Sequence, residues 1–324
     1  MSRDSKILVG DVGGTHARFA IVDASQKPFR LDYQVDFGGD EFESFAAALR
    51  KYLDCAGAEQ PSAAAIAVAG PVTAGSAHFT NRGWHASEDD LRKAGFRQAL
   101  LINDFAALAF SVSTLEPEAF RSVGPEREGL AGEPITILGA GTGFGVSCLA
   151  RYRGRSVPIA TEGGHIGFAP RGETEIAVLR VLQKRFGHVS VERILSGPGQ
   201  ENVYAALEEI AGRKSPPLTA EEITKRAQEG DTACRAALDL FCSAYGAVAG
   251  DFALAHGARG GVFIAGGIAA KIERYLQNSD FRARFEDKGR LSYFVQPIPT
   301  MLILEKNAAF VGAADALLEF RGEP

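Results

Sequence analysis

The stretch LVGDVGGTHARFAI (residues 8–21) decides the fold prediction, because an apolar run stops at a glycine pair and a second apolar run follows. The pattern predicts two β-strands, over residues 7–12 and 17–22, joined by a glycine turn. Glycine has no Cβ and tolerates positive φ, so the backbone at Gly13 and Gly14 can approach an anion such as phosphate and direct N–H groups at it. Asp11 beside the turn suggests a cation held through water. The alternative is an ordinary β-hairpin with Gly-Gly at its tip.

A second glycine loop has the same setting. GAGTG (residues 139–143) follows the apolar run ITIL (135–138) and leads into VSCL (146–149). Two such hairpins can hold a polyphosphate from both sides, with the hydroxyls of Thr15 and Thr142 as further donors. Neither loop has the Gly-Lys-Ser/Thr ending of a P-loop or the spaced glycines of a dinucleotide-binding fold. We therefore expect phosphate to be bound by main-chain dipoles.

Length, charge and cysteine usage limit the class of protein. The 324 residues, 46% of them hydrophobic, suit two domains or two lobes with a substantial core. A net charge of -5 with scattered Lys and Arg argues against a nucleic-acid or anionic-membrane partner. We expect no apolar run with the length of a signal core or membrane span, and hence a cytoplasmic protein. Four widely spaced cysteines predict buried free thiols rather than disulfides or zinc.

The first part of the chain alternates strand and helix signals, which indicates an α/β fold. A helical pattern over residues 42–53 precedes apolar strand patterns over 62–69 and 99–102. These strands deliver Gly70-Pro71 and Asn103-Asp104 at their C-terminal ends, where sites in α/β sheets usually lie. A loop rich in Glu, Gly and Pro over residues 116–134 predicts the crossing between lobes.

The second part repeats this order with more helix. A strand over 156–161 precedes Glu162-Gly163-Gly164-His165, and a strand over 261–265 runs into Gly266-Gly267, a third glycine turn against which a flat base can lie. Helical patterns cover residues 174–186, 201–211, 220–229, 232–256 and 307–320. The apolar face of the last helix predicts that it packs back onto the first lobe. The predicted domains are residues 1–113 with 306–324, and residues 114–305.

Six motifs in order resemble the bacterial glucokinase family over nearly the whole chain. They are DVGGT (11–15), NDF (103–105), GAGTG (139–143), EGGH (162–165), ERILSGPG (192–199) and FIAGGI (263–268). The resemblance implies a two-lobed, actin-like (ribonuclease H-like) ATPase fold, with mixed sheets flanked by helices and a ligand cleft between the lobes. It also implies ATP with Mg²⁺, and a homodimer. The chain departs from the family pattern at His16, where Asn is expected.

The implied activity is ATP-dependent phosphorylation of D-glucose to glucose 6-phosphate. Phosphoryl transfer to a hydroxyl needs a group that accepts the hydroxyl proton, and Asp104, directly after an apolar strand, is the candidate general base. The alternative is that Asp104 is the N-cap of a helix beginning at Phe105. Both roles can coexist in one carboxylate.

The resemblance assigns the remaining site residues. The glucose-binding set is Asn103, Asp104, Glu162, His165 and Glu192, and the ATP-binding set is Asp11, Gly13, Gly14, Thr15, Gly141, Thr142, Gly143, Gly266 and Gly267. Alternatively, His165 is a turn histidine bonded to backbone, and Glu192 is a first-turn helix residue favoured by the helix dipole. A lone His and Glu fall short of a zinc ligand set, so no protein-bound metal is assigned.

Other functions on the same fold make different demands on the sequence. A kinase for another hexose or hexosamine would keep every motif. A sugar-responsive regulator needs a helix-turn-helix segment and a basic surface, whereas only residues 1–6 precede the first predicted strand. A chaperone-type ATPase has no need of the sugar-binding set. We therefore expect an enzyme, with a non-catalytic sugar sensor as the less favoured reading.

Overall fold

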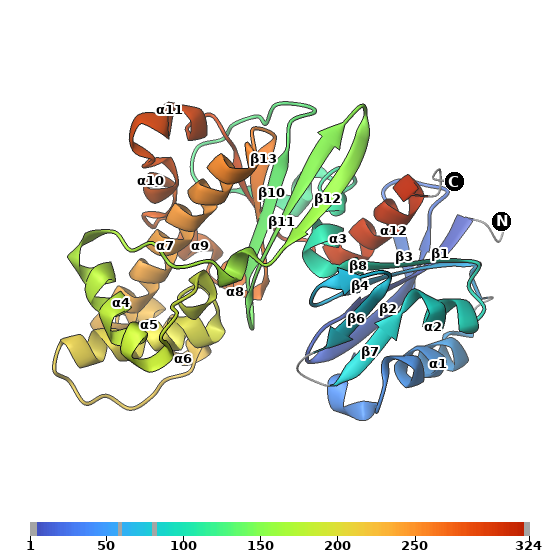
Figure 1. The fold of residues 1–324 in the computed structure, drawn as a ribbon, viewed down its shortest axis with the longest axis horizontal. Coiled ribbons are helices and arrows are strands. Elements are labelled where there is room, and N and C mark those ends of the chain that lie inside the picture. The colour runs from blue at the N-terminus through green and yellow to red at the C-terminus, as the bar shows by residue number, and fades with distance from the viewer. Residues whose placement is uncertain (1–4, 58–59, 80–82, 321–324) are drawn as a thin grey trace. The chain divides into compact units, whose positions relative to one another are not determined.

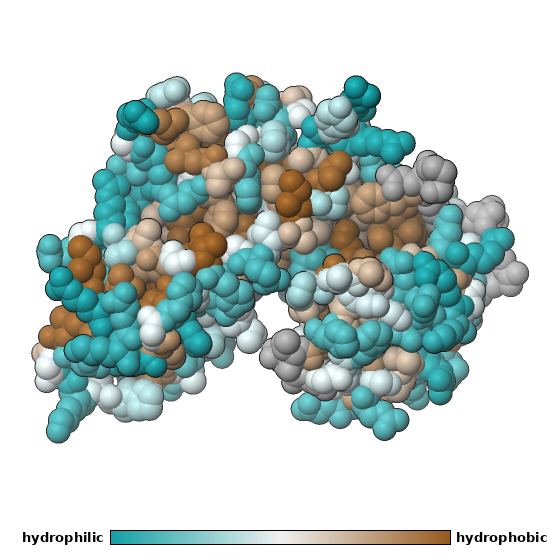
Figure 2. All heavy atoms as spheres, viewed as in Figure 1, coloured by the Kyte–Doolittle hydropathy of each residue, from teal (hydrophilic) through white to brown (hydrophobic). Residues whose placement is uncertain are grey.

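The computed structural model describes residues 5–57, 60–79 and 83–320, and the chain divides into two compact units (Figure 1). The first unit comprises Met1–Ala119, Tyr152–Ala160 and Glu305–Pro324, and the second comprises Phe120–Arg151 and Thr161–Leu304. Each unit has its own hydrophobic core. Hydrophilic side chains cover most of each unit on the face shown in Figure 2. The predicted class, mixed sheets flanked by helices, is confirmed.

The first unit is built on a five-stranded sheet. Its order is β3 (Arg30–Gly38), β2 (His16–Asp23), β1 (Lys6–Val12), β4 (Ala63–Val68) and β8 (Gln98–Asn103). Strand β1 pairs with β2 in the antiparallel sense and with β4 in the parallel sense, and β4 is parallel to β8. A small antiparallel sheet consists of β5 (Val72–Thr73), β6 (Ser76–Phe79) and β7 (Trp84–Ser87). The strands predicted from the first glycine turn are therefore confirmed.

The described residues of the first unit also form four α-helices: α1 (Phe45–Ala56), α2 (Glu88–Lys93), α3 (Asp104–Ser111) and α12 (Ala308–Phe320). Helix α1 begins at Phe45 rather than at the predicted residue 42, because the Ser44 side chain caps it by accepting a hydrogen bond from the backbone of Ala47. Helices α3 and α12 lie side by side (Figure 1). A Cβ on Gly312 would lie 1.7 Å from the Ala107 carbonyl oxygen, so only glycine allows this contact.

A six-stranded sheet lies in the second part of the chain. Its order is β12 (Arg155–Thr161), β11 (Phe144–Tyr152), β10 (Ile135–Ala140), β13 (Gly261–Ala265), β14 (Thr300–Ile303) and β9 (Phe120–Ser122). Strand β10 is antiparallel to β11 and parallel to β13. The prediction of a loop throughout residues 116–134 was wrong at β9, which is too short to show a periodic pattern and is stabilised by pairing with β14.

Eight α-helices belong to the described part of the second unit: α4 (Gly172–Phe186), α5 (Gly197–Ile210), α6 (Ala220–Gln228), α7 (Thr232–His256), α8 (Gly267–Lys271), α9 (Glu273–Gln277), α10 (Phe281–Glu286) and α11 (Ser292–Val295). The 3-10 helices among the described residues of both units are η2 (Gly39–Glu41), η3 (Pro117–Ala119), η4 (Gly163–His165), η5 (Val191–Arg193) and η6 (Gly289–Leu291). Helix α5 begins before the predicted residue 201, because Ser196 caps it and Pro198 fits its first turn.

Two expectations about apolar residues need correction. Helix α7 has the length and composition of a membrane span, whereas no run of that kind was expected; 72% of its most apolar window is buried inside the structure, so it is a core helix. The thiols of Cys148, Cys234 and Cys242 are buried as predicted, but Cys55 is exposed near the end of α1.

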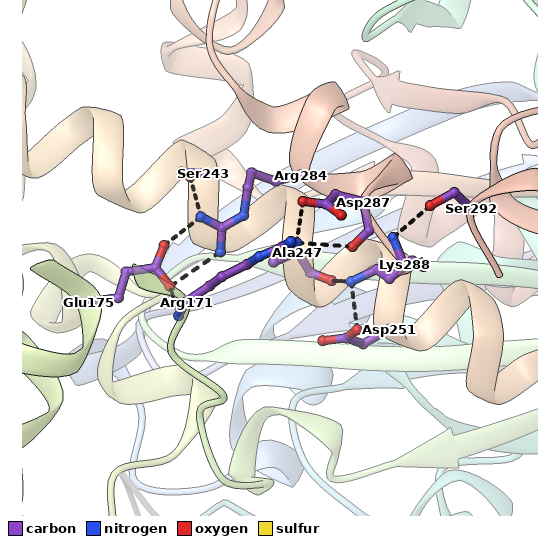
Figure 3. A network of polar contacts seen from close by, with 9 residues as sticks. All are labelled: Arg171, Glu175, Ser243, Ala247, Asp251, Arg284, Asp287, Lys288 and Ser292. Carbon is purple, nitrogen blue, oxygen red and sulfur yellow. Dashed lines mark hydrogen bonds and ion pairs between the residues drawn. The ribbon is translucent and has the colours of Figure 1, made fainter. Parts of the chain in front are cut away.

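A polar network joins three helical segments of the second unit (Figure 3). Arg284 of α10 donates from Nη1 and Nη2 to the two carboxylate oxygens of Glu175 on α4, at 2.8 and 3.2 Å. Lys288 binds the Asp251 carboxylate of α7 at 2.6 Å. Since the Glu175 side chain is only 6% exposed, this pair is a buried link between α4 and α10.

Candidate active site

The first glycine turn connects β1 to β2 and leaves open space beside its backbone. The Gly13 N–H donates to the His16 carbonyl at 2.9 Å, and the Gly39 N–H donates to the Thr15 carbonyl at 2.8 Å. A Cβ placed on Gly13 would meet no atom within 4 Å. The turn is therefore fixed at both sides while its glycine backbone remains accessible.

Asp11 lies beside this turn and is paired with arginine. Asp11 and Arg18 face each other in the β1–β2 register, and Arg18 Nη2 contacts Asp11 Oδ2. The Arg18 guanidinium also lies over the Phe310 ring, 5.2 Å from its centroid. A carboxylate already engaged by arginine suits a cation held through water better than one bound directly. At the departure from the family pattern, His16 Nδ1 lies 3.0 Å from Asp36 Oδ1.

The strand register brings the first glycine turn and the Asn103-Asp104 pair to one edge of the first sheet. Val12 is aligned with Val68 of β4, and Val68 is aligned with Asn103 of β8. Because β1, β4 and β8 are parallel, their C-terminal ends share this edge.

Asn103 and Asp104 form a single hydrogen-bonded group at the start of α3. Asn103 Oδ1 accepts from the Ala106 N–H at 3.1 Å, and Asn103 Nδ2 donates to the Gly70 carbonyl at 3.1 Å and to Asp104 Oδ1 at 3.0 Å. The Phe105 N–H donates to the same Asp104 oxygen at 2.9 Å. The proposal that Asp104 is the N-cap was therefore wrong. Asn103 is the cap, because its extended backbone places its oxygen at the third amide of the helix.

The second glycine turn, between β10 and β11, is held by a distant segment of the same unit. Within the turn the Gly141 N–H donates to the Gly143 carbonyl at 2.8 Å, and the Gly197 N–H donates to the Gly141 carbonyl at 2.9 Å. At the other end of the turn, the Phe144 N–H donates to Glu192 Oε2 at 2.9 Å. Thr142 is exposed at the tip.

The glycines of the second and third turns differ in whether a side chain would fit at their positions. A Cβ on Gly141 or on Gly267 would meet nothing within 4 Å. On Gly143 it would lie 2.5 Å from Glu192 Oε2, and on Gly266, with φ at +90°, it would lie 2.4 Å from the Ala140 carbonyl oxygen. Gly143 and Gly266 are thus required by packing, whereas Gly141 and Gly267 leave room for a ligand.

Glu162 directly precedes the short helix η4, and His165 is the last residue of that helix. Their side chains are 60% and 61% exposed, and His165 Nε2 lies 3.8 Å from Glu162 Oε2. A Cβ on Gly164 would lie 2.1 Å from the Phe144 carbonyl oxygen, so this segment packs directly on the start of β11. The His165 ring faces a carboxylate, and it is the ring of His188 that bonds the His165 carbonyl, at 3.1 Å. The reading of His165 as a backbone-bonded turn histidine was wrong.

Glu192 lies in the single turn η5, several residues before α5 begins. Glu192 is therefore a first-turn residue, as the alternative supposed, but of a three-residue 3-10 turn rather than of an α-helix. Its carboxylate binds the backbone of Phe144, 48 residues away in the chain.

Tyr245 of α7 packs against Phe144, the residue directly after the second turn, and sequence patterns did not single it out. Its ring packs edge-on against Phe144, with the ring centroids 5.5 Å apart. Complete burial raises the pKa of the Tyr245 phenol far above its usual range, so the group is neutral at physiological pH.

Each unit therefore gathers part of the predicted site. The first unit contains Asp11, Gly13, Gly14, Thr15, Asn103 and Asp104, and the second contains Gly141, Thr142, Gly143, Glu162, His165, Glu192, Gly266 and Gly267. Across residues 5–57, 60–79 and 83–320, no three His, Cys, Asp or Glu side chains form a group that could hold a metal ion. A magnesium ion here would depend on other ligands, and nucleotide phosphates are its usual ones.

Two mixed sheets that each begin with an antiparallel glycine hairpin and continue in parallel strands define the actin-like ATPase class. The model of the glucokinase family matches residues 8–319. A glucokinase of Caulobacter sp. strain K31 is 49% identical over 311 residues, which cover 96% of this chain and 94% of the relative. The chain therefore belongs to the glucokinase family.

Solved structures agree with this assignment. A glucokinase from an Antarctic psychrotroph superposes with a TM-score of 0.88 at 38% identity, covering 97% of this chain and 99% of the other. A glucokinase of Balamuthia mandrillaris, solved in complex with glucose, has a TM-score of 0.78 at 20% identity, covers 98% of this chain and 94% of that one, and shows the shared fold. The predicted enzyme class is confirmed: the chain is a glucokinase, with glucose and ATP as substrates.

Proposed function

We propose that Asp104 is the general base that accepts the proton of the glucose primary hydroxyl as the γ-phosphoryl group of ATP is transferred to it. The observation that supports this role is the pair of N–H groups, from Asn103 Nδ2 and Phe105, that converge on Asp104 Oδ1. They fix the orientation of the carboxylate at the sheet edge that also carries the first glycine turn. Orientation matters because proton transfer requires the acceptor within hydrogen-bond reach of the hydroxyl.

The sugar would be recognised by Asn103, Asp104, Glu162, His165 and Glu192. Carboxylates accept hydrogen bonds from adjacent hydroxyls, and amide and imidazole groups both donate and accept, so this set matches a polyhydroxyl ring. The exposure of Glu162 and His165 supports the proposal, because side chains that are not committed to the core can bind a ligand.

ATP would be bound by the main-chain amides of the glycine turns, with Thr15 and Thr142 as further donors. The open space at Gly13, Gly141 and Gly267 supports this assignment. Mg²⁺, when bound with ATP, neutralises phosphate charge and aligns the transferred group. Asp11 fits a role in holding that ion through water, because Arg18 already occupies part of its carboxylate.

The quaternary structure, location and domain limits belong to the same proposal. We infer a cytoplasmic homodimer with domains at residues 1–113 with 306–324 and at residues 114–305. Sedimentation of the purified chain would measure the dimer. Limited proteolysis would test whether cleavage falls near residues 114 and 306.

A coupled assay over a panel of hexoses and phosphoryl donors tests the reaction. We expect ATP and D-glucose to give the highest kcat/KM. Mannose and glucosamine, which differ from glucose at C2 alone, and fructose, a ketohexose with a different ring, should all be slower. A preference for another hexose would overturn the glucose assignment. Sugar binding without turnover would indicate a sensor.

A further inference from the structure

The carboxylate of Glu192 connects the sugar-binding residues to the second glycine turn. We propose that Glu192, besides binding glucose, positions the nucleotide-binding turn 141–143, and that glucose and nucleotide therefore strengthen each other's binding through this side chain. The inference rests on the function proposed above. It adds a positioning role toward the nucleotide and a route of coupling between the two substrates.

The contact between Glu192 and the turn is close and specific. Glu192 Oε2 accepts a hydrogen bond from the Phe144 N–H at 2.9 Å. Phe144 directly follows Gly143, the last glycine of the turn. A Cβ on Gly143 would lie only 2.5 Å from the same oxygen. The Glu192 carboxylate can therefore reach the Phe144 backbone only because residue 143 has no side chain.

The segment that carries Glu192 holds the turn at its other end as well. The Gly197 N–H donates to the Gly141 carbonyl at 2.9 Å. Between these two contacts, the Ser196 hydroxyl donates to the Glu192 carbonyl at 2.8 Å and accepts from the Gly199 N–H at 2.9 Å, which fixes the segment to the start of α5. Residues 192–197 therefore hold the turn at both ends.

A carboxylate can serve the turn and the sugar together. Its two oxygens accept about four hydrogen bonds, and the Phe144 N–H occupies one of these positions. A sugar hydroxyl bound to the same group would restrict its rotation and so strengthen its hold on the turn. Because coupling between two binding sites is reciprocal, an ordered turn would equally favour the sugar.

Isothermal titration of the full chain with Mg²⁺ and the non-hydrolysable ATP analogue AMP-PNP, without glucose, tests the positioning role. We expect E192A to bind AMP-PNP about 10-fold more weakly than the parent chain, since a charge-assisted hydrogen bond to the turn is lost. E192Q keeps an acceptor oxygen and is expected to stay within about 2-fold. E162A removes a sugar ligand that does not bind the turn, and should also stay within about 2-fold.

The coupling is measured by repeating these titrations at saturating glucose. We expect glucose to tighten AMP-PNP binding to the parent chain by about 5-fold or more, and this factor to fall toward one in E192A. E201A is the matched control, because Glu201 also accepts a backbone N–H, from Ala220 at 3.2 Å, outside the site. It should retain the full factor.

Unchanged affinity of E192A for AMP-PNP in the absence of glucose would overturn the inference. If E192A does not fold, E192D, which keeps the charge but shortens the side chain, should show the same loss, and parent-like affinity in E192D would overturn it equally. Failure of the parent chain to phosphorylate glucose would refute the proposed function instead. The coupled assay of the parent chain is therefore done before any variant is compared.

Discussion

Asn103 Nδ2 donates a hydrogen bond to Asp104 Oδ1 at 3.0 Å, while Asn103 Oδ1 caps the helix that Asp104 begins. One amide group thus sets both the start of α3 and the direction of the neighbouring carboxylate. This relationship explains how a residue in a helix turn can serve as a proton acceptor with a fixed orientation.

Replacing Asp104 with Asn should remove the proton acceptor and keep the shape of the helix start. We expect kcat to fall by about 100- to 10,000-fold, the range that general base catalysis supplies. The coupled assay measures this loss. AMP-PNP affinity and the melting temperature serve as controls and should stay near the parent values, whereas near-normal turnover would refute the role of Asp104.

Substitution of the two glycines in the second turn should have different results. Gly141→Val projects into open space, so we expect an intact fold with AMP-PNP affinity reduced by about 10-fold or more through steric exclusion of phosphate. Gly143→Val meets the Glu192 carboxylate, so we expect a lower melting temperature and weaker glucose binding as well. Calorimetry and thermal unfolding separate the two effects. Equal behaviour of both variants would contradict the assignment.

Glu162→Gln keeps the side-chain shape and removes its charge. We expect the KM for glucose to rise by about 10-fold while the KM for ATP changes by about 2-fold or less, because the lost interaction is with the sugar. Glu173→Gln is a suitable control, since Glu173 is an exposed acid in the first turn of α4. A parallel rise in both KM values would argue for a structural role of Glu162.

Removing one partner of the buried ion pair between Arg284 and Glu175 should lower the stability of the fold (Figure 3). Glu175→Ala leaves the guanidinium buried without its carboxylate, so we expect the free energy of unfolding to fall by about 3–5 kcal/mol in urea titrations. The double variant E175M/R284M replaces both charges with apolar groups and should recover much of that loss. An additive effect of the two substitutions would show that the pair is not energetically coupled.

His256 should make the stability of the enzyme depend on pH. Burial lowers the pKa of His256 below its ordinary value of 6.5, and its Nδ1 lies 2.8 Å from the Thr136 hydroxyl. The unfolded chain therefore takes up this proton first as pH falls. The stabilisation is complete above about pH 6.5 and decreases below it, by at most about 1.4 kcal/mol per pH unit for one group. Urea unfolding at pH 7.5, 6.5 and 5.5 measures the slope, which should be smaller in H256Q.

The sequence predicted the elements that have a long periodic or apolar pattern. The glycine hairpins at Gly13 and Gly141 and the full extent of α7 were correct, because each depends on local residue order. Strand β9 was missed, because it has three residues and forms through pairing with β14.

The candidate site shows the same limit. Motif order identified the family and named its residues, but the roles of neighbouring groups depended on three-dimensional contacts. Asn103, rather than Asp104, caps α3, and Glu192 reaches the backbone of Phe144 across 48 residues of sequence. No local pattern encodes a hydrogen bond over that separation.

The glycine at position 312 has a practical meaning for work with this enzyme. Because it lets α12 touch the backbone of α3, the last helix of the sequence is part of the support on which the proposed proton acceptor rests. Affinity tags, fusions or truncations that disturb α12 would therefore change turnover as well as stability.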